Sequence, residues 1–207
     1  MKKRNKFTPY DVYESIYKID YLKLQEEDKK VIVFDLDNTI MPYHIKKPTV
    51  KVAQFMQSLI DMGFNVIIMS NNHKKRISRI STFLGVDYIY GAKKPLKSGY
   101  QKVFKKFHHM KKKNYVCVGD QIITDVFGAS RVGVDCILVK PILLENEHWY
   151  TKLNRITERL IINHFKKINP SMYAKIRNIR GDLRGWLENA LAVELISSLM
   201  IVKNRVI

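Results

Sequence analysis

Five short apolar runs, rich in β-branched residues and separated by segments of helical periodicity, limit most strongly how this chain can fold. The runs cover residues 31–35, 65–70, 87–91, 115–120 and 136–140. Apolar residues at helical spacing predict helices at 50–62, 74–84, 98–110 and 122–132. Strands that alternate with helices in this way form βαβ units, whose strands are parallel. The sequence therefore predicts an α/β fold, a three-layer Rossmann-like parallel sheet with helices on both faces.

The predicted strands end next to residues that carry chemistry. In chain order, these residues are Asp35, Asp37, Ser70, Asn71, Lys94, Asp120 and Asp125. Ligands of open parallel sheets bind beyond the carboxyl ends of the strands. A helix N-cap would explain Ser70 or Asp120 alone, and a solvated side chain would explain Lys94 alone. Their recurrence at four strand ends instead predicts one site along that edge of the sheet.

An excess of positive charge is the strongest signal in the composition. Lys and Arg number 37 against 19 Asp and Glu, which gives a formal net charge of +18. Residues 91–116 contain nine lysines and no acidic residue. A solvated helix face is the ordinary explanation of such runs, but an excess of this size predicts an anionic partner. Charge alone does not choose among a membrane surface, a nucleic acid and a phosphorylated substrate.

The cysteines and the apolar segments predict a cytoplasmic protein. Cys117 and Cys136 both lie inside apolar runs, as expected of buried hydrophobic residues in a reducing compartment rather than of a disulfide. The basic N-terminus is not followed by the apolar core of a signal peptide. No window reaches the roughly 20 apolar residues that a membrane-spanning helix requires.

The order of these residues resembles that of the haloacid dehalogenase-like phosphotransferase superfamily, capless subclass IIIA. The segment DLDNT at 35–39 matches its DxDxT motif, and Ser70 matches its second motif. Lys94 matches the third motif, and Asp120 with Asp125 matches the acidic fourth. The combination of DLDNT, SNN, AKKP and GDQIITDVFGASRVG looks like the YqeG-type subgroup, which is related to phosphatidylglycerophosphate phosphatases.

This resemblance implies a role for each matched residue. Asp35 is expected to be the nucleophile and Asp37 the general acid and base. Lys94 is expected to neutralise charge that develops in the reaction, while Ser70 and the backbone N–H of Asn71 hold the phosphoryl oxygens. The implied cofactor is Mg²⁺. Its expected ligands are Asp35, the backbone carbonyl of Asp37, Asp120 and Asp125, the last directly or through water.

The spacing of the motifs predicts an open site. Only 34 residues separate Asp35 from Ser70, and 23 separate Ser70 from Lys94. Neither interval has room for a large cap domain that encloses a small substrate. An open site suits a phosphate group on something large, such as a lipid in a bilayer, a nucleic-acid end or a protein.

The C-terminal part of the chain lies outside the resemblance. We expect a phosphatase domain at residues 1–168 and a helical extension at 169–207, in which basic residues at 175–184 precede an amphipathic stretch at 183–202. That stretch has leucines along one helical face, which predicts either a helix packed on the domain or an interfacial membrane helix. Its length and Glu194 exclude a spanning segment.

These observations predict a capless, Mg²⁺-dependent phosphomonoester hydrolase at the cytoplasmic face of a membrane. The expected partners are an anionic membrane surface and a phospholipid, phosphatidylglycerophosphate, with no stable nucleic-acid partner. Rim residues expected to meet this lipid are Tyr43, His44, Lys46 and Lys47. One alternative is the same chemistry on a nucleic-acid end or another phosphorylated macromolecule, and a second is a non-catalytic basic binding module.

Overall fold

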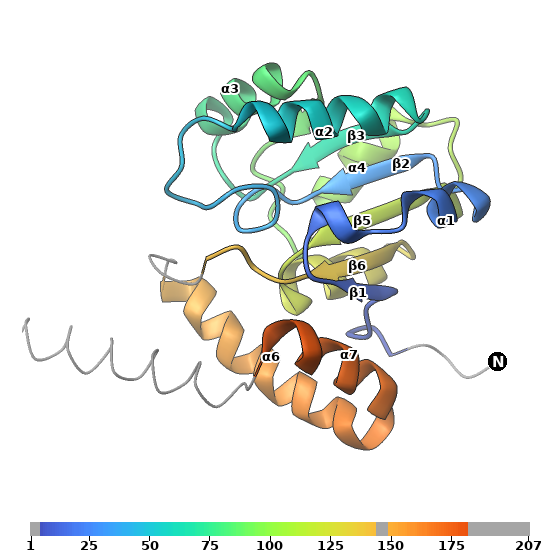
Figure 1. The fold of residues 1–207 in the computed structure, drawn as a ribbon, viewed down its shortest axis with the longest axis vertical. Helices are drawn as coiled ribbons and strands as arrows, with labels where there is room; N and C mark the ends of the chain where they lie inside the picture. Colours follow the sequence, from blue (N-terminus) through green and yellow to red (C-terminus); the bar gives the residue numbers. More distant parts are fainter. Residues whose placement is uncertain (1–4, 144–148, 182–207) are drawn as a thin grey trace, which may run out of the picture. The chain divides into compact units, whose positions relative to one another are not determined.

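The computed structural model describes residues 5–143 and 149–181, and its strands form one six-stranded sheet in the order β1-β6-β5-β2-β3-β4 (Figure 1). Each pair of neighbouring strands in this sheet is parallel. The strands are β1 (Asp11–Tyr13), β2 (Val31–Phe34), β3 (Asn65–Met69), β4 (Asp87–Ile89), β5 (Tyr115–Gly119) and β6 (Asp135–Val139). The predicted α/β fold with a parallel sheet is thus confirmed.

Strand β1 is absent from the sequence-based prediction. It has only three residues, of which Val12 alone is buried. It is held in the sheet by the register of Val12 opposite Leu138 of β6. A strand this short, which depends on a partner more than 120 positions away in the chain, has no local signature.

The helices that connect the strands begin and end at recognisable signals. They are η1 (Ile16–Lys18), α1 (Tyr21–Glu26), α2 (Val50–Asp61), α3 (Lys74–Leu84), α4 (Lys97–Lys106), η2 (Lys112–Asn114), η3 (Ile122–Phe127) and α5 (Gly128–Ser130). The side chain of Thr49 caps α2 by accepting a hydrogen bond from the backbone N–H of Val52. Helix α3 ends as predicted at Gly85, whose φ of 67° lies in the left-handed region that glycine adopts without strain.

The helix predicted at 122–132 is a different structure. Residues Ile122–Phe127 form a π-helical turn, η3, and a short α-helical turn, α5, follows it. The wider turn is marked by the backbone N–H of Val126, which donates to the carbonyl of Gln121 at 3.3 Å. Apolar periodicity predicted a helix here, but it does not distinguish a π-helix, with hydrogen bonds between residues five apart, from an α-helix, with hydrogen bonds between residues four apart.

The core lies on both faces of the sheet. On one face, alternate strand residues such as Phe34 and Ile68 pack with buried residues of α1, α2 and α3, including Leu24, Met56 and Ile80. Figure 1 shows α2 and α3 running along this side of the sheet. Helix α4 contributes Tyr100 and Val103 to the buried set, and Cys117 and Cys136 of β5 and β6 are buried and free. This burial on both faces gives the strands their nearly continuous apolar sequences.

The chain divides into two compact units, Met1–Glu147 and His148–Ile207. In the second unit, α6 (Trp149–Ile168) and α7 (Pro170–Arg180) pack on each other, and a buried ion pair of 3.2 Å joins Glu158 to Arg180. The predicted domain boundary at residue 168 falls between these helices, whereas their mutual packing places both in one unit. The predicted amphipathic stretch at 183–202 lies outside the described residues. None of the described helices has the combination of length and apolarity that crossing a membrane requires.

Candidate active site

Four neighbouring strands bring the predicted site residues to one edge of the sheet. Asp35 follows β2, Ser70 follows β3, Lys94 lies in the loop after β4, and Asp120 follows β5. These strands are adjacent in the order β5-β2-β3-β4 and all parallel, so their carboxyl ends meet. The backbone N–H of Asp35 continues the ladder by donating to the carbonyl of Val118 at 2.8 Å.

Lys94 lies at the centre of the site between two carboxylates. Its Nζ donates to Oδ1 of Asp35 and to Oδ1 of Asp125, each at 2.6 Å. Its side chain is buried, and so is that of Asp125. Burial alone would lower the pKa of Lys94, but Asp125 and Asp35 raise it above its usual value. The lysine therefore stays charged and offsets part of the negative charge around it.

Asp120 and Asp125 complete an acidic cluster with Asp35. Each of the three residues offers one carboxylate oxygen, and these three oxygens lie within 4.8 Å of one another. Three carboxylates at this spacing could hold one metal ion. The hydroxyl of Thr39 lies within hydrogen-bonding distance of Asp35 and Asp120, at 3.3 and 3.4 Å. Asp125 is further fixed because its Oδ2 accepts from the backbone N–H of Gln121.

The Asp35 carboxyl has an altered affinity for protons. Burial raises its pKa to about 8, although the Lys94 ammonium acts to lower it. The neighbouring carboxylates add to the rise, because another negative charge close by disfavours ionisation of Asp35. A divalent cation in the cluster would favour the ionised form that a nucleophile requires.

Ser70 and Asn71 occupy the loop after β3. Ser70 is buried, and its hydroxyl accepts from the backbone N–H of Asn72 at 3.1 Å. The Asn71 side chain makes two hydrogen bonds with the backbone of Lys94, accepting from its N–H at 2.6 Å and donating to its carbonyl at 3.1 Å. The sequence predicted a role only for the backbone of Asn71, whereas this reciprocal pair shows that its side chain positions the Lys94 loop.

The side chain of Asp37 contacts other residues than the Lys94 cluster does. Its Oδ1 accepts from Arg76 at 2.7 Å, and its Oδ2 accepts from the side chain of Asn72 at 3.3 Å. Its carboxylate does not belong to the three-aspartate cluster among the described residues, which leaves only its backbone for the predicted metal contact. Arg76 and Asn72 were not among the predicted site residues.

Gly119 is part of the site because it has no side chain. A Cβ at this position would overlap the carboxyl group of Asp125. That carboxyl cannot move aside easily, because Lys94 and the Gln121 N–H hold its two oxygens. The glycine of the GD pair therefore makes room for Asp125 at the end of β5.

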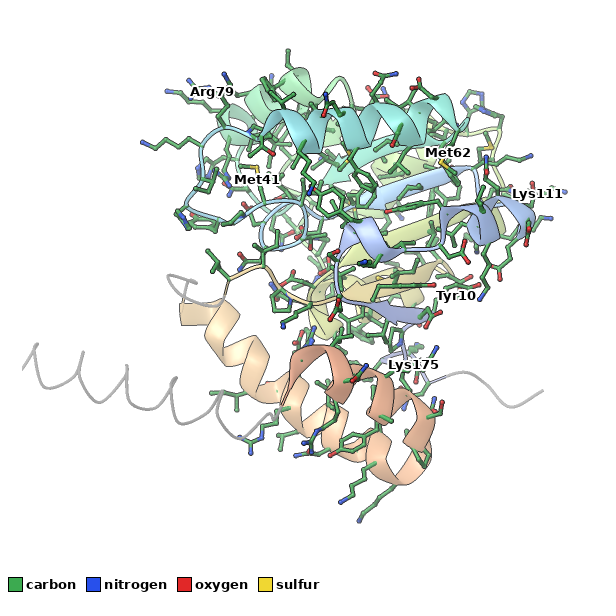
Figure 2. All side chains as sticks on the ribbon, viewed as in Figure 1. Tyr10, Met41, Met62, Arg79, Lys111 and Lys175 are labelled. Atoms are coloured by element: carbon green, nitrogen blue, oxygen red, sulfur yellow. The ribbon has the colours of Figure 1, made fainter. Side chains whose placement is uncertain are left out.

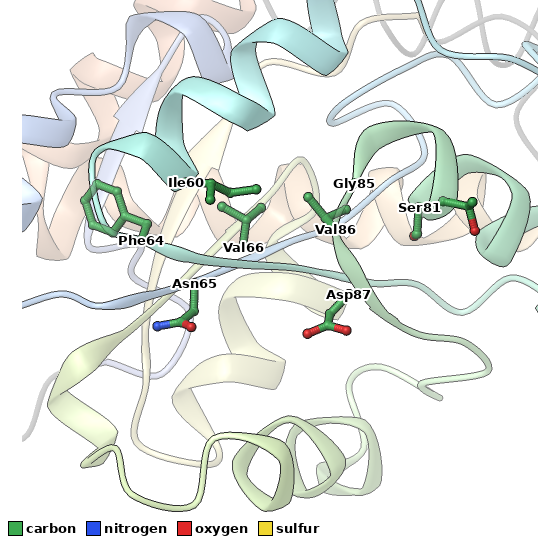
Figure 3. A pocket seen from close by; sticks show the side chains of 9 residues that line it. Ile60, Phe64, Asn65, Val66, Ser81, Gly85, Val86 and Asp87 are labelled. Carbon is green, nitrogen blue, oxygen red and sulfur yellow. The ribbon is translucent and has the colours of Figure 1, made fainter.

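A hollow on the protein lies away from this edge. It is lined by Ile60, Phe64, Asn65, Val66, Ser81, Thr82, Gly85, Val86 and Asp87 (Figure 3). Asn65 and Asp87 are the first residues of β3 and β4, so the hollow lies at the amino ends of these strands. It contains none of the predicted site residues, and we assign it no part in the chemistry.

Comparison with known proteins places the chain in a family. The model of the haloacid dehalogenase-like hydrolases matches residues 42–133, which include Ser70, Lys94, Asp120 and Asp125. The Bacillus subtilis (strain 168) protein called "Probable phosphatase YqeG" is 33% identical over 161 residues, covering 78% of this chain and 92% of that protein. The chain belongs to the haloacid dehalogenase-like hydrolases and is a phosphatase of that family. Within the family it is similar to YqeG.

Solved structures with a similar fold are more distant. A 3-deoxy-D-manno-octulosonate 8-phosphate phosphatase from Moraxella catarrhalis, in complex with magnesium, phosphate and KDO, is 14% identical, with a TM-score of 0.43 over 83% of this chain and 99% of that one. A cobalt-bound phosphatase of the same kind from Haemophilus influenzae is 16% identical, with a TM-score of 0.43 over 57% of this chain and 81% of that one. The family assignment rests on the sequence relative rather than on these structures.

Mg²⁺ is the cofactor of such phosphatases, and the residues at this site fit it. The cluster offers carboxylate oxygens, which are the ligands that Mg²⁺ prefers. Three carboxylates against one lysine leave the cluster net negative, so a bound cation would compensate charge that is otherwise buried. Asp35, Asp120 and Asp125 would hold it through their side chains.

We predict that Mg²⁺ stabilises the protein more at pH 8 than at pH 5.5. The pKa of Asp35 is raised in the metal-free folded state, so the stability it contributes is complete below about pH 4 and is lost as the pH rises through about 8. Bound Mg²⁺ favours the ionised carboxylates and offsets this loss. Melting temperatures at both pH values, with Mg²⁺ and with NaCl of equal ionic strength, test this. An equal rise in an Asp120→Asn variant would locate the cation elsewhere.

We also predict that Gly119→Ala lowers phosphatase turnover by at least about tenfold, or ~1.4 kcal/mol, because the new methyl group displaces Asp125. Asp125→Asn is the matched comparison, and both variants should show weakened Mg²⁺ binding by titration calorimetry. Circular dichroism checks that the fold is kept. Wild-type turnover in folded Gly119→Ala would show that the position of Asp125 does not matter.

Proposed function

We propose that this phosphatase is a Mg²⁺-dependent phosphomonoesterase that forms an aspartyl-phosphate on Asp35. The observation that carries the proposal is the buried cluster in which Lys94 contacts Asp35 and Asp125 at 2.6 Å each. A carboxylate fixed beside a lysine and two further aspartates has the surroundings that a nucleophile toward phosphorus requires.

The chemistry follows in two steps. An oxygen of Asp35 attacks phosphorus, the bond to the leaving oxygen breaks, and Asp37 gives that oxygen a proton. Asp37 then takes a proton from a water molecule as the water oxygen attacks phosphorus. The bond to Asp35 breaks, and inorganic phosphate leaves. When bound, Mg²⁺ supplies positive charge that reduces the repulsion between the attacking carboxylate and the phosphate.

The groups around the phosphate divide the remaining work. Lys94 offsets negative charge on Asp35 and keeps its carboxylate in one orientation. Ser70 and the backbone N–H of Asn71 are placed beside the Lys94 loop, where they would hold phosphoryl oxygens. The side chain of Asn71 secures this arrangement through the Lys94 backbone.

The rim of the site supports action at a membrane. We use "rim" for the exposed lysines and large apolar residues in the loops after β2, β4 and β6 and at the start of α4: Ile45, Lys46, Lys47, Tyr90, Lys93, Leu96, Lys97, Lys140, Ile142 and Leu143. Its apolar members are 36 to 50% exposed. The described loops after β2 to β6 contain no acidic residue other than the site aspartates, and Glu14 after the outermost strand β1 is the exception at this edge.

This composition favours an anionic lipid bilayer over a nucleic acid. Lysines alone would suit either, because both are polyanions. Exposed aliphatic side chains among the lysines gain free energy from burial at the acyl boundary, and a phosphate backbone offers them nothing comparable. The protein is accordingly proposed to act as a peripheral enzyme on the cytoplasmic membrane face, in phosphatidylglycerol biosynthesis.

The proposed lipid substrate is phosphatidylglycerophosphate. Its terminal phosphate stands clear of the bilayer on a glycerol headgroup, within reach of a site that lies behind a rim. The phosphodiester beneath it adds a second negative charge for rim lysines such as Lys46 and Lys47 to contact. Phosphatidic acid instead presents its phosphate at the acyl boundary, where the rim would keep it from Asp35.

We predict efficient phosphate release from phosphatidylglycerophosphate and at least tenfold slower release from phosphatidic acid in the same mixed micelles with Mg²⁺, roughly 1.4 kcal/mol in discrimination. The assay is malachite-green detection of phosphate, and Asp35→Asn is the control that abolishes both rates. Comparable rates on the two lipids, or a preference for a 3′-phosphorylated oligonucleotide, would overturn the lipid assignment and leave the Asp35 chemistry in place.

We predict that the rim binds vesicles that contain anionic lipid. Lys46→Glu/Lys97→Glu should weaken binding at least tenfold, since each basic residue near such a surface contributes about 1 kcal/mol and reversal also adds repulsion. The matched control is Lys111→Glu/Lys112→Glu, which changes the same charge at the opposite end of the sheet, where Figure 2 labels Lys111. Vesicle sedimentation at low salt measures both. Equal weakening by the control would mean that total charge, not the rim, drives binding.

A further inference from the structure

Arg76 makes an unusually complete set of contacts in the first turn of α3. Its Nε and Nη2 both donate to Oδ1 of Asp37, at 3.2 and 2.7 Å. Its Nη1 donates to the carbonyl oxygen of Ile45 at 2.8 Å. Its guanidinium carbon lies 5.4 Å from the centre of the Tyr43 ring, a cation–π contact. One side chain thus joins α3, Asp37 and the loop that carries Tyr43 and Ile45.

These contacts fix the orientation of the Asp37 carboxylate. Arg76 holds one of its oxygens, and the side chain of Asn72 donates to the other at 3.3 Å. The donors come from the loop after β3 and from α3, whereas Asp37 itself follows β2. A carboxylate held at both oxygens by a rigid planar donor and an amide cannot rotate freely about its terminal bond.

We propose that Arg76 is the positioning residue for Asp37, holding its carboxylate at the leaving-group side of the reaction and fastening the loop at 40–49 to α3. This inference rests on the proposed function, in which Asp37 protonates the departing oxygen. Proton transfer requires the donor and the oxygen to approach within hydrogen-bonding distance, so a loosely held Asp37 carboxylic acid would transfer its proton more slowly. Arg76 touches neither the cluster around Lys94 nor, in this role, the phosphate.

A comparison of two leaving groups distinguishes a positioning role of Arg76 from a merely structural one. An alkyl phosphate departs as a strongly basic alkoxide, which requires a proton from Asp37. A nitrophenyl phosphate departs as a weakly basic phenolate, which leaves without one. Loss of Arg76 should therefore slow the first step on the alkyl ester much more than on the nitrophenyl ester.

The experiment compares β-glycerophosphate with p-nitrophenyl phosphate in single-turnover reactions with Mg²⁺. For Arg76→Ala we expect the rate of alcohol release from β-glycerophosphate to fall at least tenfold, with phenolate release within threefold of wild type and KM within twofold. Arg76→Lys keeps the charge but not the planar pair of donors, and it should show an intermediate loss. The matched control is Arg79→Ala, one turn further along α3, where the side chain is exposed (Figure 2).

A double-mutant cycle with Asp37→Asn completes the test. If Arg76 acts through Asp37, Asp37→Asn/Arg76→Ala should be no slower than Asp37→Asn alone. Additive losses, or equal losses on the two esters, would overturn the positioning role and indicate a general contribution to folding. A raised KM with unchanged turnover would instead place Arg76 on the substrate. Should Arg76→Ala not fold, Arg76→Lys serves in the same cycle. A wild-type protein that hydrolyses neither these esters nor phosphatidylglycerophosphate would overturn the proposed function itself, and the role of Arg76 with it.

Discussion

The two ion pairs of Lys94 with Asp35 and Asp125 are the interaction on which the rest of the site depends. Removing one partner from a buried ion pair typically costs ~3–5 kcal/mol, because the other charge stays buried without compensation. Lys94 comes from the loop after β4, Asp35 from the end of β2, and Asp125 from the turn after β5. These segments are far apart in the chain, and only the parallel sheet brings them together. The cluster is therefore possible only once the sheet has formed.

Local features of the chain then determine the exact positions of the side chains in the cluster. Asp125, in the π-helical turn η3, approaches Lys94 through the space that the missing side chain of Gly119 leaves for its carboxyl group. The side chain of Asn71, in the neighbouring loop, makes two hydrogen bonds with the backbone of Lys94. These bonds fix the backbone from which the Lys94 ammonium extends. Such supporting contacts decide the orientation of the reacting groups, which a list of acidic and basic residues does not convey.

Much of this arrangement could be predicted from the sequence, and there are physical reasons why the rest could not. The long strands are predicted by their apolar runs. Because the carboxyl ends of parallel strands lie at one edge of the sheet, Asp35, Ser70, Lys94 and Asp120 were expected to lie close together. β1 was not predictable, because its pairing with β6 is a tertiary contact of three residues. Arg76 was hidden for a different reason. In the sequence it is one basic residue among KKRISR, and only the fold shows that it faces Asp37 while Arg79 remains exposed.

The side chains of the site differ in their exposure to solvent. The side chains of Lys94 and Asp125 are each 4% exposed, whereas that of Asp37 is 20% exposed. A nucleophile and the groups that stabilise charge on phosphorus gain from low dielectric, since their mutual attraction weakens in water. The proposed acid, Asp37, must instead face outward if the leaving group is part of the large substrate that we propose. In described residues 5–143 only α2 lies between β2 and β3 and only α3 between β3 and β4, so no inserted cap domain holds Asp37 in place. In the proposed mechanism, the contacts of Arg76 with Asp37 and with the carbonyl of Ile45 supply the restraint that a cap would otherwise provide.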